Sequence, residues 1–175
     1  MNQVRDVSVR RLARDDWELY RDLRFAALSD APSSFRSTLA REQEFTEAVW
    51  RERLHANCTA VAFRRDGSGP EEPVGLVGGY VGDHGAELVL MWVAPQARGS
   101  GAADALVQEV CAWATEDGHL TLALWVVESN AVAERVYARN GFIRSGRVQP
   151  VRDGEDTLEY EMIRLLRPPE AGSTT

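Results

Sequence analysis

Apolar residues recur along this chain with two different spacings, which predict an alternation of helices and strands. Spacings of three and four residues predict helices in four segments: a segment between Asp16 and Pro32, and residues 46–55, 101–117 and 129–140. Short apolar or alternating runs predict seven strands at residues 7–12, 59–64, 73–81, 88–93, 121–127, 142–148 and 158–165. Residues 35–45 follow neither spacing, and their structure stays open.

The order of these elements predicts how the strands pair. Turn-rich residues separate strands 59–64, 73–81 and 88–93, which is typical of an antiparallel meander. Strand 88–93, helix 101–117 and strand 121–127 then form a βαβ unit, whose two strands should be parallel and joined by a right-handed crossover. Both strands are continuously apolar, as expected for strands covered on both faces. The fold class is therefore α/β, with a mixed sheet.

Length and composition are compatible with one compact domain. The chain has 175 residues, of which 44% are hydrophobic and 27% are charged, so it can bury a core and is not expected to be disordered. It has no internal repeats and no linker that would divide it. We expect a single domain over residues 1–167, followed by a flexible tail at residues 168–175.

Charge and cysteine content restrict the classes of partner. The net charge of −7 repels polyphosphate backbones, which disfavours nucleic acid as a partner, although it also simply aids solubility. Cys58 and Cys111 lie far apart and outside metal-binding spacings, so neither a metal site nor a disulfide is expected. No apolar run approaches about 18 residues, and the first residues lack signal-peptide architecture. We expect a soluble, cytoplasmic protein without membrane contact.

Candidate chemistry lies in residues 93–106, which read V-A-P-Q-A-R-G-S-G-A-A-D-A-L. An apolar strand here passes through a glycine turn into an amphipathic helix, which leaves main-chain N–H groups free at the positive end of the helix dipole. Such a turn can bind an anion through the amides from Arg98 to Ala103. The P-loop string is missing, and Gly99-Ser100-Gly101 does not continue as a dinucleotide fingerprint.

The same turn resembles the hallmark of the GNAT superfamily of acyl-CoA-dependent N-acetyltransferases, a [QR]-x-x-G-x-[GA] sequence after a buried strand. Here it reads Gln96-x-x-Gly99-x-Gly101. Downstream, the family typically has an Asn, a helix containing A-x-x-x-Y, and a G-F pair, and this chain has Asn130, Ala133, Tyr137 and Gly141-Phe142. The resemblance covers about residues 74–142.

The resemblance implies a GNAT-like fold: a mostly antiparallel central sheet of about six or seven strands, with about four helices. Strands 88–93 and 121–127 would be a splayed parallel pair, and acetyl-CoA would bind between them as co-substrate, without a metal. Backbone groups of Met91, Trp92 and Val93 would pair with the pantetheine arm as an added strand does. The cofactor-binding residues implied are Met91, Trp92, Val93, Gln96, Arg98, Gly99, Ser100, Gly101, Ala102, Ala103, Asn130, Ala133 and Tyr137.

Acyl transfer to an amine needs an acid for the departing thiolate, and the resemblance assigns that role to Tyr137. Asn130 either bonds the pantetheine amides or caps its helix, and the two roles are compatible. The candidate bases are Glu87 and Glu128, with Asp83 and His84 as weaker alternatives. An amine that is already partly deprotonated needs little help, so a dedicated base is not required.

The function implied is transfer of acetyl from acetyl-CoA to a primary amine of a small molecule, by direct attack in a ternary complex. The alternatives are acetylation of peptide N-termini or lysines, and a non-catalytic acyl-CoA-binding module. Residues 28–45, the loop after Val148, and the aromatics Phe35, Trp92 and Trp125 would contact the acceptor. Trp92 and Trp125 either line the space between strands 88–93 and 121–127 or belong to the core, which is the commoner role. A homodimer is possible, and nothing fixes its interface.

Overall fold

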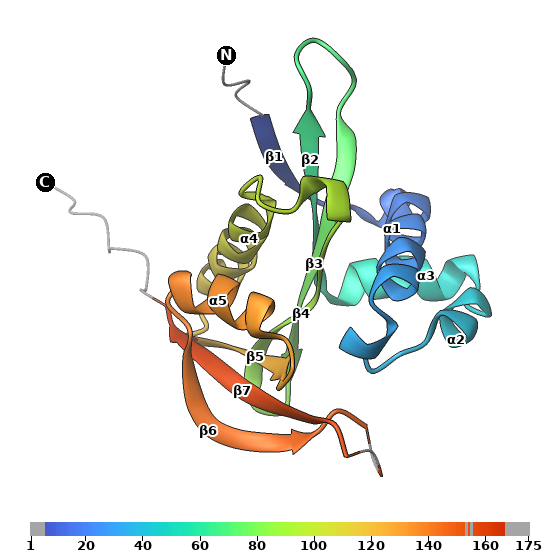
Figure 1. Ribbon diagram of the computed structural model, residues 1–175. Helices are drawn as coiled ribbons and strands as arrows, with labels where there is room; N and C mark the ends of the chain where they lie inside the picture. Colours follow the sequence, from blue (N-terminus) through green and yellow to red (C-terminus); the bar gives the residue numbers. More distant parts are fainter. Residues whose placement is uncertain (1–5, 153, 155, 167–175) are drawn as a thin grey trace, which may run out of the picture.

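The computed structural model describes residues 6–152, 154 and 156–166 of the chain (Figure 1). The tail predicted at residues 168–175 lies outside the described residues.

Seven strands form one sheet in the order β1-β2-β3-β4-β5-β7-β6. Their bounds are β1 Asp6–Arg11, β2 Cys58–Arg65, β3 Glu72–Gly82, β4 Gly85–Val93, β5 Thr121–Val127, β6 Ile143–Pro150 and β7 Leu158–Leu165. Every neighbouring pair is antiparallel except β4 and β5, which are parallel. The predicted mixed sheet with one parallel pair is confirmed.

Four helices of nine residues or more lie at the predicted positions, and a short fifth helix falls in the segment that had no clear pattern. Their bounds are α1 Trp17–Asp30, α2 Leu39–Gln43, α3 Glu47–Ala56, α4 Ala102–Glu116 and α5 Ala131–Arg139, with 3-10 turns η1 Arg14–Asp16, η2 Pro32–Ser34 and η3 Pro95–Ala97. The short helix α2 begins after Thr38, whose hydroxyl accepts from the Arg41 amide at 3.3 Å. No helix in the described residues is both long and apolar enough to span a bilayer.

The helices cover the two faces of the sheet in separate layers (Figure 1). Helices α4 and α5 lie on one face, where Leu106 and Val110 pack with Leu122 and Leu124 of β5 in one buried core. Helices α1, α2 and α3 lie on the other side, where Trp50 is the centre of a second core. Its indole meets the rings of Tyr20, Phe25 and Phe45 edge-on, at centroid distances of 5.3 to 5.7 Å.

Strands β4 and β5 separate soon after they pair. Their register contains only two residue pairs, Ala86 with Leu122 and Glu87 with Ala123. The pairing of β4 with β3 shifts between Leu76 and Gly78, and Leu90 has a φ of 60°, which is unusual for a residue with a branched side chain. This bulge gives β4 one extra residue and bends it.

Two predictions for this strand need correction. Strand β4 begins at Gly85, three residues earlier than the predicted residue 88, because polar Glu87 interrupts the apolar run without interrupting the pairing. The strand is also not covered throughout on both faces. Leu88 and Trp92 are buried, whereas Leu90 and Met91 are only partly buried, because β5 has moved away from them.

Candidate active site

The turn before α4 presents free main-chain donors. Gly99 and Gly101 have φ angles of 76° and 88°, a region that glycine adopts without strain. Gly101 caps α4 without a side chain, so the amides of Ala102 and Ala103 have no hydrogen-bond partner in the described chain. The amides of Arg98 and Ser100 instead close turns onto the carbonyls of Pro95 and Ala97, each at 3.3 Å.

One side-chain donor in this turn is also unpartnered. The Ser100 hydroxyl is buried, and no hydrogen bond to it occurs within the described residues. A buried hydroxyl without a partner is costly, and a phosphate oxygen would satisfy it together with the free amides. The cradle, defined here as residues 98–103, therefore fits the diphosphate of the expected co-substrate.

Arg98 is committed to a different contact. Its Nη2 donates to Asp30 at 2.5 Å and its Nε donates to the Val93 carbonyl at 3.1 Å. Asp30 also accepts from the Trp92 indole at 2.9 Å. These bonds join the end of α1 to the end of β4. They place the Trp92 side chain in the core beside α1 rather than in the gap between β4 and β5. Gln96 is exposed, and its carbonyl accepts from Arg64 at 3.0 Å.

A cavity of about 130 Å³, called here the wedge cavity, occupies the gap between β4 and β5. Its walls come from both strands, from α5, from the segment after α1 and from β7. The lining residues are Ser34, Phe35, Leu88, Val89, Leu90, Met91, Trp125, Val126, Val127, Asn130, Ala133, Tyr137 and Glu159. Because β5 residues pair with β4 only as far as Glu87, the edge of β4 that faces β5 has no strand partner along this cavity within the described residues, while the other edge pairs with β3.

Asn130 both lines the wedge cavity and caps α5. Its Oδ1 accepts from the Ala133 amide at 3.1 Å. The structure gives its side-chain NH₂ group no partner among the described residues, so the group is available to a ligand carbonyl. The two roles expected for Asn130 are thus geometrically compatible.

Tyr137 lines the same cavity from two turns further along α5. Its ring is 6% exposed and packs edge-on against Phe142, with centroids 5.9 Å apart. Its hydroxyl forms no hydrogen bond within the described chain. Burial raises the pKa of Tyr137 far above its usual value, because the anionic phenolate would lie in an apolar environment. The phenol is therefore protonated at neutral pH and can act as a donor.

A second cavity of about 400 Å³, called here the outer cavity, adjoins the first. The two share Ser34, Phe35, Trp125, Glu159 and part of β4. The remaining lining comes from the β3–β4 hairpin, α1, the segment after η2, and β6. The residues found only in the outer cavity are Arg24, Arg36, Tyr80, Asp83, His84, Glu87, Arg147 and Gln149.

The two candidate bases lie in different surroundings. Glu87 lines the outer cavity, where its Oε2 accepts from the Tyr80 hydroxyl at 3.1 Å. Burial, and then the negative charge of Glu87, raise the pKa of Tyr80. Glu128 is exposed and lines neither cavity, and its amide donates to the Leu158 carbonyl at 2.9 Å. Of the two carboxylates, the fold brings Glu87 alone to the cavities.

Several lining residues were not singled out from the sequence. Arg24, Arg147 and Glu159 line the outer cavity, although charged side chains on amphipathic segments normally face solvent. Trp125 also lines both cavities, whereas core packing was the commoner expectation. No spacing signal would have found Arg24, Arg147 and Glu159. Arg24 is brought to the cavity by the packing of Phe35 and Glu42 on α1, and the other two by the packing of β6 and β7 beside β5.

The described residues contain no cluster of three or more His, Cys, Asp or Glu side chains able to hold a metal ion. Cys58 and Cys111 are both free and buried.

Comparison with known proteins gives consistent matches to one family. Residues 12–142 match the acetyltransferase (GNAT) family. An uncharacterized N-acetyltransferase of Mycobacterium tuberculosis (strain ATCC 25618 / H37Rv) is 34% identical over 84 residues, which cover 48% of this chain and 54% of that protein. The match thus spans about half the length of this curated relative.

Solved structures share the fold. A GNAT-family acetyltransferase from Streptococcus pneumoniae superposes with a TM-score of 0.71 at 19% identity, covering 93% of this chain and all (100%) of that one. Spermidine N-acetyltransferase from Vibrio cholerae, in complex with CoA and spermine, gives a TM-score of 0.69 at 20% identity, covering 91% of this chain and 95% of that one.

Proposed function

Because the chain belongs to the acetyltransferase (GNAT) family, we propose that it transfers an acetyl group from acetyl-CoA to a primary amine of a small molecule. The observation that carries this proposal is the wedge cavity, which opens where β4 and β5 part and which Tyr137 enters from α5. The alternatives are transfer to a peptide amine and acyl-CoA binding without catalysis.

The chain offers two separate sets of contacts to the co-substrate. The free amides and the Ser100 hydroxyl of the cradle suit its diphosphate. The unpaired main chain of β4 near Met91, and the Asn130 amide, suit the two amide groups of a pantetheine arm. The Val93 carbonyl already accepts from Arg98, and Trp92 is paired with Leu76 of β3, so Met91 is the better main-chain partner.

Direct attack by the amine requires proton transfer at two positions. Tyr137, whose phenol is protonated at neutral pH, would donate to the sulfur as the thiolate departs. Glu87 lies in the adjoining cavity and would accept the proton from the ammonium, directly or through water. The main chain at the wedge would supply hydrogen bonds to the oxyanion that forms at the acetyl carbonyl.

The shape of the outer cavity favours a small acceptor over a peptide. Ser34, Phe35 and Arg36 line one side of it, and Arg36 forms an ion pair with Glu159 of β7. The Arg152 side chain donates to the carbonyls of Phe35 at 2.8 Å and Arg36 at 3.3 Å. These bonds attach the segment to β7 and to the turn after β6, so we infer that it stays in place and leaves little room for an extended peptide. The Vibrio cholerae structure likewise contains a small polyamine.

Release of free CoA thiol across an amine panel tests this proposal. The panel contains amino acids, polyamines, aminoglycosides and short peptides, each incubated with acetyl-CoA and the full chain. We expect turnover with at least one small primary amine and none with the peptides. Turnover with peptides alone would favour the peptide alternative. Binding of acetyl-CoA in calorimetry without thiol release from any amine would favour the non-catalytic alternative.

A further inference from the structure

Three arginines from three separate elements line the outer cavity. Arg24 lies on α1, Arg36 lies between η2 and α2, and Arg147 lies on β6. Guanidinium groups gathered around one cavity repel a purely cationic ligand and attract an anionic group. Their own pairing inside the protein decides how much of that attraction remains.

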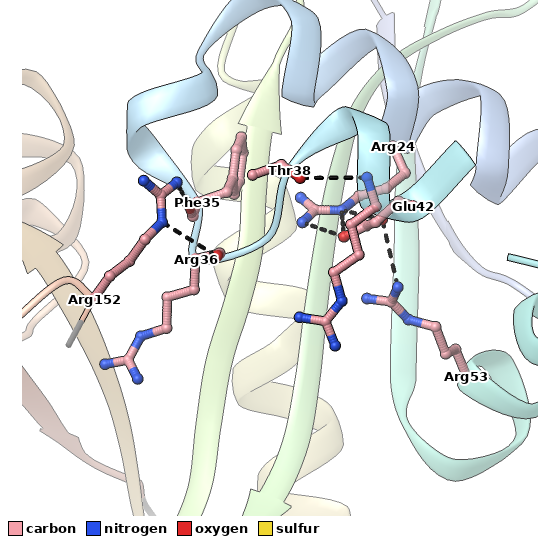
Figure 2. A network of polar contacts seen from close by, with 8 residues as sticks. Arg24, Phe35, Arg36, Thr38, Glu42, Arg53 and Arg152 are labelled. Atoms are coloured by element: carbon pink, nitrogen blue, oxygen red, sulfur yellow. Dashed lines mark hydrogen bonds and ion pairs between the residues drawn. The ribbon is translucent and has the colours of Figure 1, made fainter. Parts of the chain in front are cut away.

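Arg24 retains an unused donor. Its side chain is 2% exposed, and its Nε and Nη2 bind both carboxylate oxygens of Glu42 at 2.9 to 3.2 Å. Its Nη1 is buried and has no partner within the described chain. The guanidinium lies over the ring of Phe35, 4.5 Å from the centroid, and Phe35 lines both cavities. Figure 2 shows Arg24 and Phe35 side by side.

Glu42 does not neutralise Arg24 completely, because the Glu42 carboxylate also pairs with Arg53. Arg53 Nη1 lies 3.4 Å from the Glu42 Oε2 atom, so one fully buried carboxylate faces two guanidinium groups (Figure 2). This cluster therefore carries an excess positive charge behind Phe35. Buried charge without full compensation is costly, and a ligand carboxylate near Phe35 would compensate it.

Few acids that line the outer cavity remain for a ligand with several ammonium groups. Glu159 already pairs with Arg36 and accepts from Gln149 at 2.8 Å. Glu87 accepts one hydrogen bond, from the neutral Tyr80 hydroxyl, and its charge is left for the reacting amine. A polyamine needs a further carboxylate for each additional ammonium group, and beyond Glu87 and Glu159 the lining offers Asp83, on the exposed hairpin turn.

We propose that the acceptor carries a carboxylate beside its primary amine, and is thus an amino acid rather than a polyamine. The amine lies toward Glu87 and the wedge cavity, and the carboxylate is bound on the side lined by Arg24, Arg36 and Arg147. Arg147 stands over Trp125, 5.4 Å from the ring centroid, with one nitrogen 2.8 Å from Glu161. This inference rests on the proposed function and specifies its substrate class.

The test compares amino acids with the amines that lack only the carboxylate, such as lysine with cadaverine and phenylalanine with phenethylamine, and includes spermidine. Thiol release with acetyl-CoA gives kcat/KM for each. Loss of one charge-assisted interaction costs about 10- to 100-fold, so we expect at least one amino acid to exceed its partner amine by that factor. Arg147→Gln should remove the preference by raising KM for the amino acid much more than KM for its partner amine, and Arg147→Lys should restore part of the preference.

Arg65→Gln is the matched control, since Arg65 is equally exposed (51% against 52%), also pairs with a glutamate, and lines neither cavity. Calorimetry of acetyl-CoA with each variant shows whether the fold and the co-substrate site survive. Equal kcat/KM within every pair, or spermidine as the best acceptor, would overturn the inference while leaving the acetyltransferase proposal in place. Thiol release from no amine at all would overturn both.

Discussion

Burial determines the chemistry available to Tyr137. A phenol on an amphipathic helix is ordinarily a packing residue, and this one does pack against Phe142. Tyr137 also lines the wedge cavity, however, its hydroxyl has no hydrogen-bond partner within the described residues, and burial raises its pKa. We propose that the same side chain serves the core through its ring and the site through its oxygen.

Replacing Tyr137 by Phe keeps the ring and removes the proton donor. We expect kcat to fall by about 100-fold or more, the size typical of a lost general acid, with little change in the Kd of acetyl-CoA. Thiol-release kinetics and calorimetry measure the two quantities. Tyr20→Phe is the matched control, because Tyr20 is equally buried but belongs to the core around Trp50.

The pH profile checks the same assignment independently. The folded-state pKa of Tyr137 lies above its ordinary value of 10.0, so the acid stays protonated through the usual tyrosine range. Activity should therefore show no decline attributable to Tyr137 between pH 7 and about pH 10. A decline in that range that disappears in the Phe variant would contradict the raised pKa of Tyr137, and an unchanged kcat in that variant would contradict its assignment as the acid.

Individual site residues differ in how visible they are in the sequence. Asn130 and Tyr137 belong to a spaced motif, and Gly99 and Gly101 belong to a turn with a physical reason for glycine. Arg24 has no such signal, because a helix sequence does not show which of its arginines is covered by a later segment. Its burial arises only when Glu42 and Phe35 fold over α1.

Among the secondary-structure elements, helix and strand identity followed from periodicity, whereas β4 was incompletely predicted. Its early start and its bulge at Leu90 are consequences of pairing with β3, and a single-strand pattern carries no information about pairing. The separation from β5 has the same origin. The main-chain groups proposed to contact the co-substrate are thus exposed by strand geometry that apolar runs do not encode.

The turn into α4 gives a prediction that involves this helix as a unit. Gly101→Asp places a negative side chain at the cradle, and we expect it to raise the Kd of acetyl-CoA at least about tenfold through like-charge repulsion. Gly118→Asp is the matched control, because Gly118 lies just beyond the other end of α4 with a φ of 83° and open space around its Cβ position, as at Gly101.

Both variants should lose about 1 kcal/mol of stability from the left-handed backbone, and only Gly101→Asp should lose affinity in calorimetry. Equal affinities for the two proteins would show that the diphosphate does not lie on these amides.

For the complete fold, two cores on opposite faces of one sheet must form together. The core around Trp50 holds α1 and α3 against the sheet, and the Arg24–Glu42 pair fastens α2 to α1 within this layer. The order of elements predicted the sheet and its parallel pair. It could not predict this buried ion pair, which joins residues 18 positions apart through the segment without a clear pattern.

Glu42→Gln should lower the free energy of unfolding by about 3 kcal/mol or more, because two guanidinium groups then lose their shared buried anion. Denaturant unfolding of the whole chain measures the change. Glu47→Gln, which removes an exposed partner of Arg51, should cost less than about 1 kcal/mol. Similar losses in the two variants would contradict the structural role assigned to Glu42.

The short β4–β5 contact has a mechanical consequence. Within the described residues, the strands β1, β2, β3 and β4 pair with the strands β5, β7 and β6 through two residue pairs, so we expect the sheet to bend most easily along this line. A molecule that enters the gap and bonds to both strands would link the two parts of the sheet through additional hydrogen bonds. Its residence would then be visible as slower deuterium uptake along both strands, well before any chemical product accumulates.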